Sequence, residues 1–175
     1  MPSPVGHVLG GIAVGFLASR DRGWRLPVVC GVVAALPDID FLLPLPHRGP
    51  THSIAAAVAA FAVTLAITSV AREQLPRLRV ATAIGLAVLS HVLFDWLGQD
   101  SSTPRGLMAL WPLTSTYYVS EVNVFNAVDR RYWLEGFWRR NTIAVAREMA
   151  ILLPIVWIVG RRRRSPEGLD YETQP

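Results

Sequence analysis

Five apolar runs separated by polar segments constrain the fold of this chain more than any other feature of its sequence. They comprise residues 5–18, 26–36, 54–70, 80–97 and 143–159. A membrane-spanning helix needs about 20 apolar residues, with about 17 as the lower limit. The third and fourth runs reach that length. The other three are short or interrupted, and by length alone they could be buried helices of a soluble protein. We expect an all-α fold, a polytopic membrane helix bundle of about five apolar helices.

The composition agrees with a membrane bundle that forms a single domain. Of the 175 residues, 51% are hydrophobic and only 17% are charged, and all seventeen basic residues are arginine. We expect one membrane-embedded domain over residues 1–164 and a disordered polar tail over 165–175. The arginines stand in short groups beside the apolar runs, as at membrane flanks, and no basic stripe alternates with exposed aromatic residues. This pattern disfavours nucleic-acid binding.

The arginines also predict the orientation of the bundle. Segments 20–25 and 71–79 and the tail after residue 159 hold ten arginines, whereas the opposing loops hold six. With five spans, the three arginine-rich segments fall on one side, and the positive-inside rule places that side, with the C-terminus, in the cytoplasm. The segment 98–142 is rich in tryptophan and tyrosine. We expect it to be partly helical and to lie at the outer membrane interface.

One polar stretch, residues 36–53, stands between apolar flanks. Its sequence, LPDIDFLLPLPHRGPTHS, contains Asp38, Asp40, His47, Arg48 and His52. A buried carboxylate is costly unless a cation or hydrogen-bond donors satisfy it. Two aspartates and two histidines so close together are therefore hard to explain by packing, and we interpret the stretch as half of a metal site.

The other candidate ligands fall at the same end of the predicted bundle. His7 lies at the outer start of the first run. His91 and Asp95 lie near the outer end of the fourth run, four residues apart and therefore on one helix face. All four histidines and four of the seven aspartates converge on this end: His7, Asp38, Asp40, His47, His52, His91, Asp95 and Asp100.

Structural roles are the alternatives for single members of this set. His7 could lie at a helix interface, Asp38 could be a cap, and His91 with Asp95 could form a hydrogen-bonded pair between helices. The combination Asp-x-Asp with His-x4-His is much harder to explain in this way. Ionisable groups within apolar helices are also functional by default.

The ligand types narrow the choice of metal. Imidazole and carboxylate together suit zinc, and also manganese or iron(II). The number of candidates allows either two ions or one ion with further carboxylates that orient the imidazoles. A metal with an open position activates water and polarises a phosphoryl or carbonyl oxygen. Arg48, next to His47, could bind a phosphate or a developing oxyanion, and an ion pair with Asp38 or Asp40 is the alternative.

These motifs resemble those of the YdjM-like membrane-bound metal-dependent hydrolases. The resemblance rests on Gly6-His7, Leu36-Pro37-Asp38-Ile39-Asp40, His47-Arg48-Gly49-Pro50-Thr51-His52-Ser53, His91-x3-Asp95, and Gly106 with Leu110-Trp111-Pro112-Leu113. It implies a multi-pass protein of the bacterial inner membrane with a divalent-metal hydrolase site, remotely similar to zinc-dependent phospholipase C. The metal ligands that it implies are His7, Asp38, Asp40, His47, His52, His91 and Asp95.

Functions from different classes remain open. As a hydrolase, the protein would act on a lipid or lipid-linked phosphoester at the extracytoplasmic membrane face. Its catalytic residues would be Asp40, His47 as ligand or general base, and Arg48 as the group that steadies an anionic substrate. The alternative is a non-catalytic metal-binding membrane protein, a transporter or a sensor, although transport requires ligands near the bilayer midplane. A polar cluster that only fixes helix packing is the third reading.

Overall fold

The computed structural model of the chain is all-helical. It describes residues 1–19, 23–42, 47–70, 76–101 and 103–162, which contain no strand beyond isolated bridges. The elements are α1 (Pro4–Ala18), α2 (Arg25–Ala35), the 3₁₀ helix η1 (Leu36–Leu42), the 3₁₀ helix η2 (Pro50–His52), α3 (Ile54–Val70), α4 (Arg77–Leu97) and α5 (Phe137–Arg162). Each predicted apolar run forms one α-helix, so the all-α prediction is confirmed.

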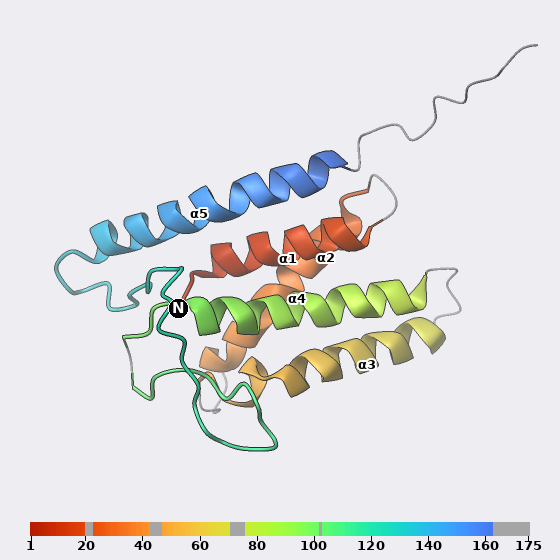
Figure 1. The fold of residues 1–175 in the computed structure, drawn as a ribbon, viewed down its shortest axis with the longest axis horizontal. Helices are drawn as coiled ribbons and strands as arrows, with labels where there is room; N and C mark the ends of the chain where they lie inside the picture. Colours follow the sequence, from red (N-terminus) through yellow and green to blue (C-terminus); the bar gives the residue numbers. More distant parts are fainter. Residues whose placement is uncertain (20–22, 43–46, 71–75, 102, 163–175) are drawn as a thin grey trace, which may run out of the picture.

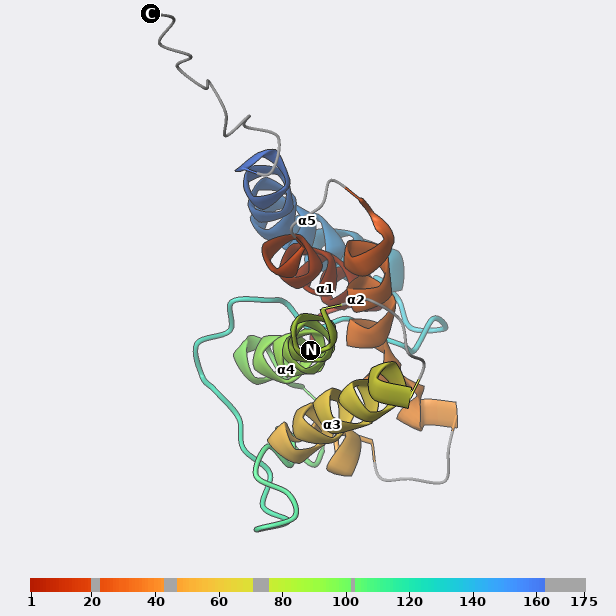
Figure 2. The same cartoon turned by 90° about the vertical axis from the view of Figure 1, so that its right-hand side faces the viewer.

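Four of the helices lie side by side, and α2 crosses them at an angle (Figures 1 and 2). Helix α1 packs against α2, α4 and α5, and α3 packs against α4. The chain reverses direction from each helix to the next. The starts of α1, α3 and α5 therefore meet the ends of α2 and α4 at one end of the bundle (Figure 1). This is the end where the sequence places the candidate ligands.

Small residues let α1 and α2 pack in close contact. A Cβ on Gly11 would lie 2.3 Å from the carbonyl oxygen of Cys30, and a Cβ on Gly15 would lie 2.4 Å from the Cα of Pro27. No other residue fits at either position without moving the helices apart. Helix α1, which carries His7, is thereby held directly on the helix that leads into η1.

The outer surfaces of the helices are apolar. Helix α3 contains no charged residue, and among its seventeen residues only Ala57 is buried. Large apolar side chains such as Val58, Ile67 and Trp157 remain exposed. Such a surface is unusual for a soluble monomer and is what lipid requires. The protein is therefore a membrane helical bundle.

The helix lengths change the predicted spans. Among the described residues, α4 and α5 are long and apolar enough to cross a membrane, whereas α1 and α3 are shorter apolar helices. The run 143–159, which we expected to be short or interrupted, forms part of one continuous helix, because α5 has 26 residues and continues through Pro154. Helix α3 has 17 residues, about 25 Å at 1.5 Å per residue, and α2 has 11, about 16 Å. By length alone, α2 does not span.

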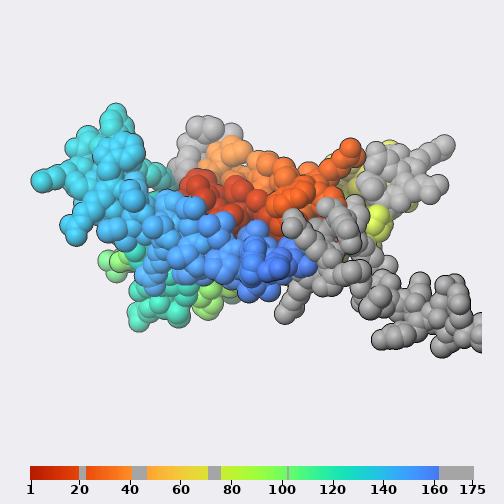
Figure 3. Space-filling view, turned by 90° about the horizontal axis from the view of Figure 1, so that it is seen from above, coloured from red at the N-terminus to blue at the C-terminus, as the bar shows by residue number. Residues whose placement is uncertain are grey.

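The segment between α4 and α5 wraps around the end of the bundle that holds the ligands (Figure 1). Its helical part is limited to residues 137–142, which begin α5, and the rest consists of turns and isolated bridges. Tyr132, Trp133 and Trp138 are exposed. In Figure 3 the start of α5 and the residues before it project beyond α1. The interfacial position of this segment stays a prediction, and the predicted tail 165–175 lies outside the described residues.

Candidate metal centre

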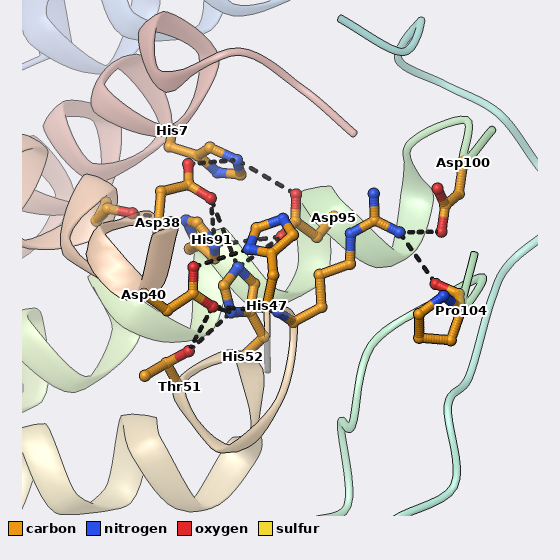
Figure 4. A network of polar contacts seen from close by, with 12 residues as sticks. His7, Asp38, Asp40, His47, Thr51, His52, His91, Asp95, Asp100 and Pro104 are labelled. Atoms are coloured by element: carbon orange, nitrogen blue, oxygen red, sulfur yellow. Dashed lines mark hydrogen bonds and ion pairs between the residues drawn. The ribbon is translucent and has the colours of Figure 1, made fainter. Parts of the chain in front are cut away.

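Four segments bring the predicted ligands together at one end of the bundle (Figure 4). The first turns of α1 supply His7, and the last turns of α4 supply His91 and Asp95. The 3₁₀ helix η1 supplies Asp38 and Asp40, and the chain from residue 47 to η2 supplies His47 and His52. The structure thus places all seven predicted ligands in one network.

Three imidazoles surround the carboxylates of Asp38 and Asp95. The Nε2 atoms of His7, His52 and His91 lie 3.3, 3.4 and 3.2 Å from oxygens of Asp95. The same three atoms lie 4.0, 3.5 and 3.9 Å from oxygens of Asp38. These five residues form the inner cluster. Four of them are buried, and only Asp38 keeps some exposure, 21% of its side chain.

The hydrogen bonds behind two of the imidazoles fix their tautomers. His91 Nδ1 lies 2.8 Å from the carbonyl oxygen of Ala34, which can only accept, so His91 carries its proton on Nδ1. The hydroxyl of Thr51 donates to Asp40 and therefore accepts from His52 Nδ1, 2.9 Å away. When these rings are neutral, as a metal ligand must be, Nε2 is a lone pair in each. Both lone pairs point at carboxylate oxygens.

This arrangement leaves acceptors facing acceptors in a buried site. Within the described part of the chain, Nε2 of His7, His52 and His91 and both oxygens of Asp95 are buried without a hydrogen-bond partner. Each such atom costs about 1–3 kcal/mol if it stays unsatisfied. A cation between the imidazoles and carboxylates resolves all of these costs.

Asp40 forms a second group with His47 and His52. Its oxygens lie 2.7 Å from His47 Nδ1 and 3.3 Å from His52 Nδ1, and they accept from Thr51 and from the backbone N–H of Arg48. The ligand atoms of Asp40, His47 and His52 are close enough to hold an ion. In the tautomers described above, however, Asp40 orients two imidazoles, the role of the carboxylate behind a metal-bound histidine.

One of the two predictions for Arg48 is an ion pair of its side chain with Asp38 or Asp40. The structure shows a different partner. Its guanidinium forms an ion pair with Asp100 and reaches the carbonyl of Pro104. Its backbone, at a φ of +63°, lies in the left-handed region, where non-glycine residues are uncommon. In that conformation its N–H donates to Asp40, while its guanidinium contacts Asp100 and Pro104 in the segment that follows α4.

Three residues of the network are not among the predicted metal ligands or catalytic residues. Thr51 links His52 to Asp40, and its place beside His52 is the one signal that could have revealed it. Asp100 pairs with Arg48, and Arg130 donates to Nε2 of His47 at 2.9 Å. The first of these contacts joins residues that are 52 positions apart in the sequence, and the second joins residues that are 83 positions apart. The local sequence therefore does not predict either contact.

A buried acid on α5 anchors the helix that carries His7. Glu148 is fully buried and accepts from the backbone N–H of Ser3, at 2.7 Å, and from the Ser3 hydroxyl. Ser3 also caps α1 by accepting from the N–H of Gly6. Helix α5 thereby fixes the start of α1, one turn before the ligand. The sequence shows this glutamate within an apolar run but not its partner.

Comparison with known proteins tests the resemblance. The family model described as YdjM inner membrane protein matches residues 1–164. The chain belongs to the YdjM inner membrane protein family. Neither a curated protein nor a solved structure matches it. The predicted family and its inner-membrane location are thus confirmed.

Proposed function

We propose that this YdjM family protein is an integral membrane metal-dependent hydrolase that acts on phosphoesters, including lipid-linked ones. One observation carries the proposal. Lone pairs of His52 and His91 would point at the carboxylates of Asp38 and Asp95 inside a buried cluster, an arrangement that a bound cation would satisfy. Those four residues and His7 are the candidate ligands, and a zinc ion that keeps a position for water would use three or four of them.

Zinc fits the donor set best. Zinc–nitrogen and zinc–oxygen bonds of about 2.0–2.1 Å in a tetrahedron separate neighbouring ligand atoms by about 3.3 Å. The contacts of Asp95 with the three imidazoles measure 3.2–3.4 Å. Manganese and iron(II) accept the same ligands, so metal analysis of the purified protein is the test of identity. One ion in the inner cluster accounts for the orienting hydrogen bonds of Asp40, whereas a second ion would displace them.

Residues beside the cluster would supply the other groups that the reaction needs, a general base and a positive charge. A bound zinc ion polarises a phosphoryl oxygen and lowers the pKa of coordinated water. His47 is oriented by Asp40, retains 22% exposure of its side chain, and would take a proton as general base. Arg48 would add positive charge for an anionic substrate.

The site would face the extracytoplasmic side of the membrane, with the C-terminus in the cytoplasm. The excess of arginine at the opposite end of the bundle supports this orientation. The test removes Cys30, the one cysteine of the sequence, and places a new cysteine at Val122, in the exposed segment after α4, or at Leu78, near the start of α4. An impermeant thiol reagent applied to whole cells should label the first variant and spare the second. The reverse pattern would overturn the orientation.

Metal content and hydrolysis together test the function. Wild-type protein purified in detergent should contain about one zinc ion and cleave bis(p-nitrophenyl) phosphate. His52→Ala and Asp95→Ala should lose both the zinc and the activity. Glu121→Gln, which removes an exposed carboxylate elsewhere in the segment after α4, should keep both. Equal metal content in the wild type and the two cluster variants would refute the metal site.

The same measurements separate the other readings. Zinc bound by the wild type without hydrolysis of any phosphoester would favour a transporter or sensor. Zinc uptake into vesicles would then distinguish between those two. If the wild type contains no zinc and the cluster variants are less stable than the wild type, a structural role is favoured.

A further inference from the structure

Arg130 donates a hydrogen bond to Nε2 of His47, the ring nitrogen that a base or a metal ligand would use. Nε2 of His47 accepts from Nη2 of Arg130 at 2.9 Å, and Nδ1 is committed to Asp40 at 2.7 Å. Nε2 can accept from a guanidinium only as a lone pair, so the ring is neutral in this arrangement. His47 can therefore act as a base or as a ligand only after Arg130 moves.

The backbone that carries Arg130 is fixed, whereas its side chain is exposed. The N–H of Asp129 donates to Oδ1 of Asn141 at 2.7 Å, and Nδ2 of Asn141 donates back to the carbonyl of Asp129 at 2.8 Å. This reciprocal pair ties the residue before Arg130 to the first turns of α5. Arg130 itself is an exposed residue. Its guanidinium can thus change partner without a movement of the loop.

The guanidinium groups of Arg130 and Arg48 have different hydrogen-bond partners. Arg48 is buried and already has the carboxylate of Asp100. Arg130 donates to the imidazole of His47, and it lies near Arg48 and the carboxylates of Asp38, Asp40 and Asp95. A phosphate oxygen brings a full negative charge to a hydrogen bond with a guanidinium and can accept two parallel N–H bonds, whereas the imidazole nitrogen of His47 is uncharged and accepts one. An anion at the opening of the cluster would therefore take Arg130 from His47.

We propose that Arg130 recognises the phosphate group of the substrate and, by leaving His47 to bind it, frees Nε2 of His47 for the reaction. This inference rests on the proposed function and deepens it. The substrate class becomes phosphomonoesters and phosphodiesters with at least one charged oxygen. A neutral carboxylic ester, which offers Arg130 no charge, neither displaces it nor exposes His47. Arg130 then sets both specificity and the order of events.

Inorganic phosphate is the probe, measured by titration calorimetry on the zinc-loaded full-length protein in detergent. Arg130→Gln should weaken phosphate binding by about tenfold to hundredfold, the loss expected for a hydrogen bond to a charged group. Arg130→Lys, which keeps the charge without the planar guanidinium, should bind phosphate with an affinity between those of the wild type and Arg130→Gln. The matched control is Arg131→Gln, which removes the same charge from the next residue. Arg131 is exposed and pairs with Asp129 instead of His47, so its loss should leave binding unchanged.

Zinc content and kinetics complete the test. Arg130→Gln should keep its zinc, and its KM for bis(p-nitrophenyl) phosphate should rise far more than its kcat falls. Loss of zinc in Arg130→Gln would show a structural role and overturn the inference. It is also overturned if the wild type binds no phosphate, or if Arg130→Gln binds phosphate as tightly as Arg131→Gln. Phosphate binding that depends on Arg130, without any phosphoester hydrolysis, would instead refute the proposed function and leave the assignment of Arg130 intact.

Discussion

Replacing Thr51 by valine tests the tautomer of His52, on which the metal centre depends. The hydroxyl of Thr51 lies 2.9 Å from His52 Nδ1 and donates to Asp40 at 3.1 Å. Valine keeps the branched shape and removes only the hydroxyl. His52 then loses the acceptor that keeps its proton on Nδ1, and Nε2 is no longer held as the metal-binding lone pair.

The structure also sets the size of the effect. Loss of a group that orients a metal-bound histidine costs about 10–100-fold in metal affinity. Asp40 lies 3.3 Å from His52 Nδ1 and can partly replace the hydroxyl, so we expect the lower end of that range, about tenfold or 1.4 kcal/mol. Thr51→Ser, which retains the hydroxyl, should bind zinc nearly as tightly as the wild type.

Competition with a chromogenic chelator on detergent-purified protein measures this affinity. Circular dichroism must show the same helix content in wild type, Thr51→Val and Thr51→Ser, because η2 is close to the start of α3. A dissociation constant of Thr51→Val equal to that of the wild type would refute the reasoning about the tautomer. An equal loss in both variants would show that packing, and not the hydroxyl, is responsible.

Three further predictions follow from the packing and the ion. Gly11→Ala should destabilise the protein by about 1–3 kcal/mol, because its Cβ would lie 2.3 Å from the Cys30 carbonyl. Gly160→Ala, whose Cβ would meet only ordinary contacts at 3.6 Å, should be neutral or stabilising, and unfolding in sodium dodecyl sulfate compares the two. By the same assay, Glu148→Ala should cost about 1–3 kcal/mol, because the N–H and hydroxyl of Ser3 lose their acceptor, and Glu148→Gln should cost less. EDTA should lower the melting temperature of the wild type, since an ion at 1,000 times its dissociation constant contributes about 4 kcal/mol, but it should leave that of His52→Ala unchanged.

The sequence predicts the fold because its apolar runs and their breaks are local features. The starts and ends of α1 and α2 fall within a residue of the predicted runs. The start of α5 does not, because Phe137 to Asn141 are aromatic, charged or polar residues that extend the helix beyond its apolar part. Alternation of direction along the chain then places His7, Asp38 and Asp95 at one end without any knowledge of packing.

The finer structure of the site depends on contacts that periodicity does not encode. The ion pair of Arg48 with Asp100 and the hydrogen bond of Arg130 with His47 come from an irregular segment whose path is set by tertiary packing. The same holds for Glu148, which reaches Ser3 across 145 residues. Residue types therefore indicate the ligands, whereas the residues that orient and cover them emerge only from the folded chain.

The spread of the ligands along the chain has a consequence for biosynthesis. His7 on α1 and Asp95 on α4 are 88 positions apart, and they meet only when the fourth helix is in place. The cluster therefore does not exist while the chain is being made, and an ion can enter only after α1 to α4 have been inserted. In the orientation proposed above, that ion comes from the periplasm. The supply of metals in that compartment, and not the buffered cytoplasmic pool, would then decide which one the protein carries.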